Sequence, residues 1–599
     1  MREDVQFRAI DIVFADFLCS REGGNTGVLR TAAACASFAV GQGNICVDLA
    51  DLFDRDEVAA AADRLRCSKM VGKPGEYRPL VLDEANRLYL HRYWKYESDL
   101  AKALISMAAD QPDVDTELLK DGLFRLFPPT AESPDWQKTA AAAAVRNRFC
   151  VISGGPGTGK TTTVVKIIAL LLEQAKGSRM RIGLAAPTGK AAARLKESIY
   201  RAGKELETRT TVAENIPADV ATIQRLLGVI PDSCRFRHNA GNPLPFEALV
   251  VDEASMVPLG LMTKLVEALA PGSRLILLGD RDQLASVEAG AVLGDICNTG
   301  HRFGFSPEFQ AFIAEATGCS VPERCAGDSA APLADSVVVL QKNYRFDEES
   351  GIGLVSTAIN SGTVATLLGR MKDGTTGGLI LRATPPPDLL QKKLAHAVVA
   401  GFSDYLRQES PDDVLRTFDR FRVLCALRQG LYGVEGINNI IETCLADEGI
   451  IKTDKQWYHG RPVMVTVNDY SLKLFNGDIG ITLNDPESDI GLSVYFPSLN
   501  GQSRTYSPYR LPAHETVFAM TIHKSQGSEF ERVLLVIPPF SHQILTREIL
   551  YTGLTRARAS VELWCSDEIF TAACGRRVER RSGLRQALWE GFERVSILS

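Results

Sequence analysis

The residues from Gly154 to Thr161 carry the clearest chemistry in this 599-residue sequence. They fit the phosphate-binding-loop (P-loop) pattern G-x-x-x-x-G-K-[ST], in which backbone N–H groups surround a polyphosphate. The pattern predicts that Lys160 reaches the β- and γ-phosphates of ATP and that the Thr161 hydroxyl binds Mg²⁺. The predicted ATP-binding residues are Gly154, Gly155, Pro156, Gly157, Thr158, Gly159, Lys160, Thr161 and Thr162.

The sequence on either side of this loop supplies the elements that must position it. Residues 149–153 form an apolar run that predicts a buried parallel strand, and residues 161–168 open a predicted helix. The N-terminus of that helix adds a field that favours negative charge. An ordinary glycine-rich turn is the alternative, and the flanking strand and helix argue against it.

Two further apolar segments end in polar residues that suit the same site. Residues 248–251 lead to Asp252 and Glu253, which predicts that Asp252 holds Mg²⁺ and that Glu253 orients or activates the attacking water. Residues 274–278 lead to Gln283, which we expect to sense the γ-phosphate, because ligands of open α/β sheets bind beyond the carboxyl ends of strands. Alone, either segment also fits a solvated strand end or a polar turn. The P-loop favours the functional interpretation of both.

Length and composition are typical of a globular protein with several domains. The 599 residues allow about three to five domains, and the chain is 45% hydrophobic and 23% charged. No apolar run approaches the roughly 20 residues that span a bilayer, and residues 1–6 hold no signal-peptide core. We therefore expect a cytoplasmic protein without a membrane partner. The net charge of −6 leaves nucleic acid open as a partner, because a binding channel needs only local Lys and Arg.

Three segments of the chain differ in pattern. Residues 1 to about 130 mix helical apolar patterns with short strand-like pieces and hold no nucleotide motif. Residues from about 131 to 345 alternate apolar strands with helical stretches, as in an α/β domain with a parallel sheet. Residues from about 346 to 599 repeat that alternation around a β-rich interval near 455–512. The patterns predict an α/β fold with two lobes, of which the second is interrupted.

Further motifs follow the P-loop in a fixed order. They are Ala186-Pro187-Thr188-Gly189-Lys190, Asp252-Glu253, Gly279-Asp280-Arg281-Asp282-Gln283, Asn343-Tyr344-Arg345, His523-Lys524-Ser525-Gln526-Gly527 and Tyr551-Thr552-Gly553-Leu554-Thr555-Arg556-Ala557. In this order and spacing the chain resembles the superfamily-one DNA helicases of the 5′-to-3′ branch. Residues 423–428, 433–438, 460–464 and 476–480 narrow the resemblance to the RecD family, the α subunits of RecBCD enzymes (exonuclease V). The resemblance is strong over about residues 131 to 565 and weak before them.

This resemblance implies an architecture. We expect a mainly helical N-terminal domain for partner docking over residues 1–115. Two RecA-like P-loop motor lobes are expected over residues 116–345 and 346–599. The β-rich interval at about 455–512 resembles the small SH3-like β-barrel inserted in the second motor lobe of this family.

The resemblance also assigns roles to single residues. Gln137 matches the family glutamine that reads the adenine edge, and Arg345 is expected to approach the γ-phosphate. Arg556 matches the arginine finger of the second lobe, which stabilises charge in the transition state. A departure occurs at Gln224, where the family often has histidine. The positions that match contacts to the backbone of single-stranded DNA are Thr188, Lys190, Thr222, His523 and Ser525.

The function implied is that of an ATP-dependent, 5′-to-3′ single-stranded DNA translocase and helicase. It would act on single-stranded and duplex-end DNA, in a heterotrimer with RecB-like and RecC-like subunits, to process double-strand breaks for homologous recombination. The sequence shows no nuclease constellation outside the motor motifs, so we expect exonuclease activity only of the complex, through the RecB-like subunit.

Other functions remain open from the sequence. A self-sufficient RecD-like helicase would need helix-hairpin-helix repeats near its N-terminus, and none is detected. A relaxase-linked helicase would need an N-terminal histidine cluster, whereas His91 is the only histidine in the first 130 residues. A non-catalytic assembly subunit is disfavoured by the intact ATP-site motifs. An RNA motor stays possible, because backbone contacts scarcely distinguish the two sugars.

Overall fold

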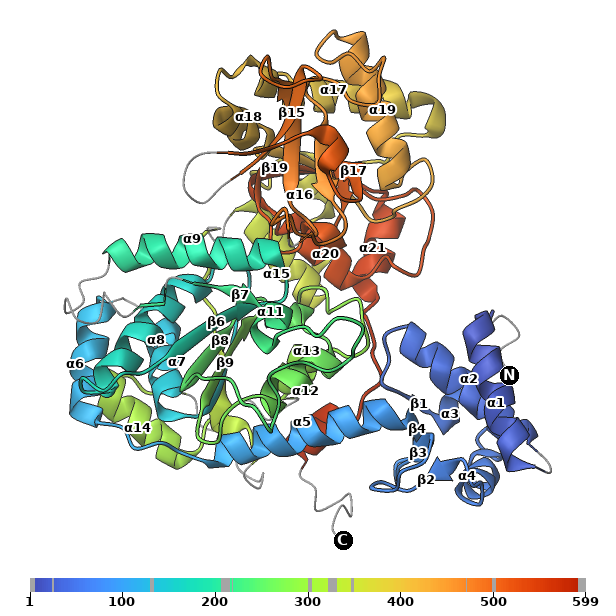
Figure 1. Cartoon of the computed structure of the whole chain (residues 1–599), viewed down its shortest axis with the longest axis vertical. Coiled ribbons are helices and arrows are strands. Elements are labelled where there is room, and N and C mark those ends of the chain that lie inside the picture. Colours follow the sequence, from blue (N-terminus) through green and yellow to red (C-terminus); the bar gives the residue numbers. More distant parts are fainter. Residues whose placement is uncertain are drawn as a thin grey trace.

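The computed structural model describes residues 6–23, 26–129, 134–205, 216–217, 219–299, 304–321, 331–345, 350–469, 471–497 and 503–590. Two α/β lobes lie one above the other, and a smaller N-terminal unit lies beside the first lobe (Figure 1). The α/β fold with two lobes is confirmed.

The N-terminal unit is mainly helical, as predicted, and it also holds a small sheet. Its four strands pair in the order β1-β4-β3-β2, with only β2 and β3 parallel. The long helix α5 leaves this unit and packs along α12 of the first lobe. The elements are α1 (Ala9–Glu22), α2 (Gly27–Gly41), β1 (Cys46–Asp48), α3 (Leu49–Leu52), α4 (Val58–Arg66), β2 (Val71–Gly72), β3 (Leu80–Leu82), β4 (Arg87–Leu90) and α5 (His91–Ala109).

The first lobe is built on a parallel sheet of six strands in the order β10-β5-β9-β8-β6-β7. Helices cover both faces, so the central strands are apolar on both sides. The elements are α6 (Thr116–Leu126), α7 (Trp136–Arg146), β5 (Phe149–Ser153), α8 (Lys160–Gln174), β6 (Ile182–Ala186), α9 (Gly189–Glu205), β7 (Ala221–Thr222), α11 (Ile223–Leu227), β8 (Ala248–Val251), η1 (Ala254–Met256), α12 (Leu259–Glu267), β9 (Arg274–Gly279), α13 (Val292–Cys297), α14 (Pro307–Thr317), η2 (Ala334–Ser336) and β10 (Val337–Val339).

The second lobe repeats this plan with five parallel strands in the order β11-β20-β19-β12-β18. Its elements are α15 (Gly351–Ser361), η3 (Val364–Thr366), α16 (Leu368–Lys372), β11 (Leu379–Arg382), α17 (Pro387–Phe402), η4 (Tyr405–Arg407), α18 (Pro411–Phe418), β12 (Phe421–Cys425), α19 (Val434–Asp447), β18 (Ala519–Thr521), η6 (His523–Ser525), β19 (Phe530–Val536), α20 (Arg547–Leu554), β20 (Ala557–Trp564) and α21 (Asp567–Gly575). The helix that follows, α22 (Leu584–Trp589), packs elsewhere.

The β-rich interval forms a separate antiparallel sheet between α19 and β18. Its strands pair in the order β16-β15-β14-β13-β17, which agrees with the β-rich insertion expected there. Closure of this sheet into an SH3-like barrel stays a prediction. The elements are β13 (Pro462–Val465), β14 (Ile479–Asn484), β15 (Leu492–Phe496), β16 (Arg504–Tyr506), η5 (Pro508–Arg510) and β17 (His514–Thr516).

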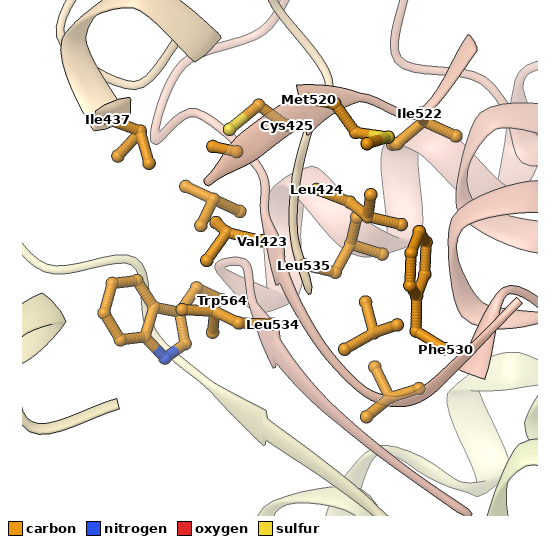
Figure 2. Packing of buried hydrophobic residues seen from close by; sticks show 14 of the residues in the cluster. Val423, Leu424, Cys425, Ile437, Met520, Ile522, Phe530, Leu534, Leu535 and Trp564 are labelled. Carbon is orange, nitrogen blue, oxygen red and sulfur yellow. The ribbon is translucent and has the colours of Figure 1, made fainter. Parts of the chain in front are cut away.

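The core of the second lobe shows why its strands read as continuous apolar runs. Leu424 on β12 is the register partner of Leu535 on β19, and the preceding pair is Val423 and Leu534. Because side chains alternate along a strand, these pairs point to opposite faces. Figure 2 shows Leu424 and Leu535 on the side of Phe530, with Val423 and Leu534 on the other. Both faces are buried, so close packing holds the sheet in place.

The last described residues return to the first lobe. After α21 the chain runs down past the first lobe to α22, which packs against α5 and α13 (Figure 1). Arg580 donates to the backbone oxygens of Glu288 (2.8 Å) and Gly290 (2.9 Å). The buried carboxylate of Glu97 on α5 accepts hydrogen bonds from the Ser582 hydroxyl (3.0 Å) and the Gly583 N–H (2.9 Å). Residues 580–590 therefore join both the first lobe and the N-terminal unit.

Leu535→Ala should destabilise the protein by about 2–5 kcal/mol, because it opens a cavity in a fully buried part of the second lobe. Urea unfolding of the full chain measures this. Leu389→Ala makes the same change on α17, where the side chain is 43% exposed, and should cost far less. Equal losses in the two variants would contradict the rigid packing of this sheet.

Candidate active site

The P-loop connects β5 to α8, as predicted. Gly157 (φ 86°) and Gly159 (φ 79°) adopt the left-handed backbone region that favours glycine. A Cβ at position 159 would lie 2.2 Å from the amide nitrogen of Gln137. That nitrogen donates to the Thr158 backbone oxygen at 3.0 Å. Gln137 thus lies directly against the loop, at the end expected to bind the base.

A cavity of about 480 Å³ lies between the two lobes and is lined by all six predicted catalytic residues. The first lobe contributes loop residues, both acids and Gln283, and the second lobe contributes Arg556. The other predicted ATP-binding residues, Gln137, Gly154, Gly155 and Thr158, do not line the cavity. The predicted residues that line the cavity are Pro156, Gly157, Gly159, Lys160, Thr161, Thr162, Asp252, Glu253, Gln283, Arg345 and Arg556.

The acids at the ends of β8 and β9 lie in a weakly hydrated environment. Burial raises the pKa of Asp252 to about 6, Glu253 adds to the rise, and Lys160 opposes it. Burial also raises the pKa of Asp280 to about 6, again against the effect of Lys160. Glu253 itself has φ 51°, an uncommon value for a residue with a side chain. The strand end therefore aims two neighbouring carboxylates into one cavity.

Lys160 and Gln283 complete the first-lobe side of the cavity. The Lys160 ammonium donates to the backbone oxygens of Gly154 (2.6 Å) and Gly155 (3.0 Å). Gln283 is 6% exposed, and its amide nitrogen donates to Asp280 at 3.1 Å. In the described part of the chain, the side-chain oxygen of Gln283 has no hydrogen-bond partner. That oxygen is therefore an unused hydrogen-bond acceptor at the edge of the cavity.

Arginines from both lobes meet at Glu529, which lies between η6 and β19. Its carboxylate accepts hydrogen bonds from Arg345 (2.7 Å) and Arg558 (3.0 Å), and it also pairs with Arg194 on α9. Burial alone would raise the pKa of Glu529, but the three guanidinium groups outweigh burial and hold it at about 2. Glu529 is therefore an anion that ties the first lobe to the second beside the cavity.

Arg556 follows α20 and is almost fully buried. Its guanidinium donates to the backbone oxygens of Thr552 (3.1 Å) and Ser528 (3.2 Å) while lining the cavity. Burial lowers the pKa of Arg556, although Glu253 and Glu529 oppose the change. The arrangement places cations, carboxylates and an amide around a space of the kind that polyphosphate hydrolysis needs.

The five predicted DNA contacts lie outside this cavity. Thr188 and Thr222 are half-buried, and each hydroxyl accepts a backbone N–H at the start of a helix. Lys190 points toward the second lobe, with its ammonium 6.0 Å from the centre of the Phe530 ring, and burial lowers its pKa to about 8. His523 is half-buried. Burial lowers the pKa of its imidazole, and the positive charge of Arg580 lowers it further.

Ser525 is fully buried, and its hydroxyl donates to the Ile522 backbone oxygen at 2.7 Å. In this arrangement the side chain stabilises its own turn. The neighbouring His523 and Lys524 on η6 are half-buried, and the motif alone does not give this difference. Contact with DNA stays a prediction for all five residues.

Three residues in or beside the site received no role from the sequence. Asp280 and Tyr551 lie within motifs that mark the family, yet the sequence gives no sign that these two residues contact each other. Glu529 follows Gly527 by two residues, and an acid so close to a functional motif was the available signal. The Arg345–Glu529 and Tyr551–Asp280 bonds join residues 184 and 271 positions apart, so only the folded lobes bring them together.

Known protein families match the segments of the chain that form this site. A model described as "RecBCD enzyme subunit RecD, N-terminal domain" matches residues 3–89, an "AAA domain" model matches residues 137–289, and a "UvrD-like helicase C-terminal domain" model matches residues 516–563. The chain is 38% identical to the RecBCD enzyme subunit RecD of Mycobacterium tuberculosis over 590 residues, which cover 96% of this chain and 94% of that protein. The chain belongs to the RecD family. It is also 35% identical to RecD of Haemophilus influenzae over 533 residues, covering 84% of this chain and 80% of that protein.

A more distant match is a crystal structure of Bacteroides Pif1 bound to ssDNA. It has a TM-score of 0.38 and 17% identity, and it covers 74% of this RecD-family chain and 94% of the Pif1 chain. Family membership makes the chain an ATP-dependent DNA helicase. Within the described residues, no helix is both long and apolar enough to cross a membrane.

Glu529→Gln should lower the stability of this RecD-family chain by about 1–3 kcal/mol at pH 7, because the partly buried guanidinium groups of Arg194 and Arg345 lose their counter-ion. The folded pKa of Glu529, about 2, lies below the ordinary glutamate value. Its stabilisation is therefore present above about pH 4.5 and is lost as the pH falls toward 2. The difference in melting temperature between wild type and variant should narrow from pH 5 to pH 3.

Glu531→Gln provides the matched control. Glu531 is 55% exposed and pairs with Arg420 at 3.9 Å, so its loss should change stability by less than about 1 kcal/mol at any of these pH values. A pH-independent difference for Glu529→Gln would show that the carboxylate charge is not what joins the lobes.

Proposed function

We propose that this chain is the 5′-to-3′ translocase and helicase subunit of a RecBCD-type helicase/nuclease that processes double-strand breaks for homologous recombination. The observation that carries the proposal is the convergence of Lys160, Glu253, Gln283 and Arg556 on one cavity between two lobes. A site built from both lobes changes whenever the lobes move, which is what couples ATP hydrolysis to movement.

The proposed chemistry follows from the positions of these groups. Lys160 moves from the loop oxygens to the β- and γ-phosphates of ATP, and Glu253 orients or activates the attacking water. Gln283 senses the γ-phosphate, and Arg345 and Arg556 stabilise the charge that develops on it. Gln137 reads the adenine edge beside the loop. Arg345 must exchange Glu529 for the phosphate in order to act.

Mg²⁺ fits the donors at this site. Thr161 and Asp252 line the same cavity, and both offer the oxygen ligands that Mg²⁺ prefers. Mg²⁺ commonly uses one or two protein ligands together with phosphates and waters, so a pair of this kind suffices. When bound, the ion neutralises charge on the β- and γ-phosphates.

DNA is proposed to bind across both lobes, near Thr188, Lys190, Thr222 and His523. The β-rich insertion approaches this region, since a Cβ on Gly189 would lie 3.1 Å from Cβ of Phe475. Hydroxyl and cationic groups bind phosphates without reading sequence, as a motor on any DNA requires. ATP-driven closure and opening of the lobes would then advance the chain along one strand, from 5′ to 3′.

RecB-like and RecC-like subunits are the proposed protein partners, and the N-terminal unit within the predicted 1–115 domain is the proposed docking surface. On α1, Ile10, Val13 and Phe17 are 61%, 63% and 54% exposed. Their spacing of three and four residues places them on one face of the helix. A cluster of exposed large apolar side chains is a feature of protein interaction sites.

The remaining assignments follow from this role. Residues 116–345 and 346–599 form the proposed motor lobes, exonuclease activity resides in the RecB-like partner, and the assembly acts in the cytoplasm on single-stranded and duplex-end DNA. The alternatives are a self-sufficient helicase and a non-catalytic assembly subunit. The match of residues 3–89 to the RecD N-terminal domain favours the complex over the first, and the complete cavity favours catalysis over the second.

Lys160→Gln should abolish ATP hydrolysis and unwinding while DNA binding persists, because it removes the cation that holds the phosphates. Unwinding is measured on duplexes with a 5′ or a 3′ overhang, with RecB-dependent unwinding disabled in the co-purified complex. The wild type should open only the 5′-overhang substrate. Lys264→Gln, on the outer helix α12, should behave as the wild type. Unwinding by Lys160→Gln, or a preference for the 3′ overhang, would overturn the assignment.

Val13→Lys combined with Phe17→Ser should reduce co-purification with the RecB-like and RecC-like subunits by at least about 10-fold, because charge and polarity replace an apolar contact. ATP hydrolysis by the chain should not change. The control Leu389→Ser alters an exposed leucine of the second lobe and should leave co-purification intact. Full retention of both partners by the double variant would refute docking through α1.

A further inference from the structure

Tyr551 belongs to the second lobe, but its hydroxyl lies within the first. Helix α20 carries this residue, and the hydroxyl donates to the carboxylate of Asp280, at the end of β9, at 3.0 Å. Tyr551 is 5% exposed and Asp280 is 2% exposed. A hydrogen bond from a hydroxyl to a buried carboxylate is among the stronger polar contacts in proteins. This bond crosses the boundary between the lobes.

Asp280 is the centre of the turn that holds Gln283. One carboxylate oxygen accepts the Asp282 N–H at 3.0 Å, and the other accepts both the Gln283 amide at 3.1 Å and the Tyr551 hydroxyl. The same carboxylate therefore receives the amide proposed to sense the γ-phosphate and a hydroxyl from the other lobe. Any shift of Tyr551 relative to Asp280 disturbs the acceptor that orients Gln283.

Tyr551 also lies against the P-loop. A Cβ built on Gly155 would lie 2.9 Å from the Tyr551 hydroxyl oxygen, so the absence of a side chain at this position is what admits the hydroxyl. The next residue on α20, Thr552, accepts the Leu284 N–H at 3.0 Å with its hydroxyl oxygen. Two successive residues of α20 thus fix the helix on the segment 280–284.

Helix α20 also leads directly to Arg556. The Arg556 guanidinium donates to the Thr552 backbone oxygen at 3.1 Å, so the position of this cation depends on the helix that carries Tyr551. One short helix therefore binds the sensor turn with Tyr551 and Thr552 and aims Arg556 into the cavity. The position of α20 therefore determines both the contact to the sensor turn of the first lobe and the position of Arg556 in the second.

We propose that Tyr551 is a positioning residue that fixes the second lobe on the Asp280–Gln283 turn, so that Gln283 and Arg556 reach the γ-phosphate together. This inference rests on the proposed ATPase function of the cavity. Because Tyr551 acts on the geometry of the transition state rather than on nucleotide binding, its loss lowers kcat and leaves KM for ATP nearly unchanged.

The test is Tyr551→Phe in the full chain, which keeps the ring and removes only the hydroxyl. We expect ssDNA-stimulated kcat to fall about 10- to 100-fold, the range that corresponds to a lost hydrogen bond to a charged group, with KM within about threefold. Binding of ADP with aluminium fluoride, an analogue of the transition state, should weaken by a similar factor, whereas ADP binding should not change. A purely structural role would not produce this difference between the two ligands.

The control is Tyr432→Phe, which also removes a buried hydroxyl bond in the second lobe, to the Pro385 backbone oxygen at 2.8 Å, outside the cavity lining. It should match the wild type. A cycle with Asp280→Asn adds a second measure, because the double variant should lose less than the product of the single losses. Wild-type kcat for Tyr551→Phe, equal weakening of both ligands, or multiplicative losses would each overturn the inference. An inactive wild type would instead refute the proposed function.

Discussion

The balance of charge in the cleft between the two lobes is the constraint on which the rest of the structure depends. The Glu529 carboxylate of the second lobe pairs with Arg194 and Arg345 of the first lobe. Nearby, the carboxylates of Asp252 and Asp280 interact with the charge of Lys160. Charges taken out of water must be paired or they destabilise the fold. The charged side chains of the cleft can therefore exchange one ionic partner for another. A bound polyphosphate is a further anion with which the lysine and arginine side chains can pair.

Such an exchange requires rigid supports. The loops that carry Lys160, Asp252 and Asp280 all leave the carboxyl ends of parallel strands, and those strands are buried on both faces. Displacing one loop by an ångström would mean repacking the sheet beneath it, which is costly because protein interiors are close-packed. We therefore expect movement to occur between the lobes rather than within them.

The sequence predicted the parts of this site that depend on local pattern. The P-loop, the acids after β8 and the position of Gln283 were accessible because each follows an apolar strand at a fixed spacing. The inward turn of Ser525, the three arginines at Glu529 and the Tyr551–Asp280 bond were not, because they depend on how two separately patterned lobes meet. The return of residues 580–590 to the first lobe was missed for the same reason. The stretch of residues 576–582 that leads to α22 forms no helix or strand and has one apolar residue, so it gives no signal of where α22 packs.

That returning segment has a consequence for the order in which the protein is completed. The buried carboxylate of Glu97 obtains two of its donors from Ser582 and Gly583, which are synthesised 485 and 486 residues later. Domains generally fold as they leave the ribosome, the N-terminal ones first. The core of the N-terminal unit is formed by residues before 91, but the Glu97 carboxylate on α5 lacks two of its donors until residues 582 and 583 have been made. A ribosome that stops before residue 582 releases a chain whose buried Glu97 carboxylate, made 485 residues earlier, is missing both of these donors.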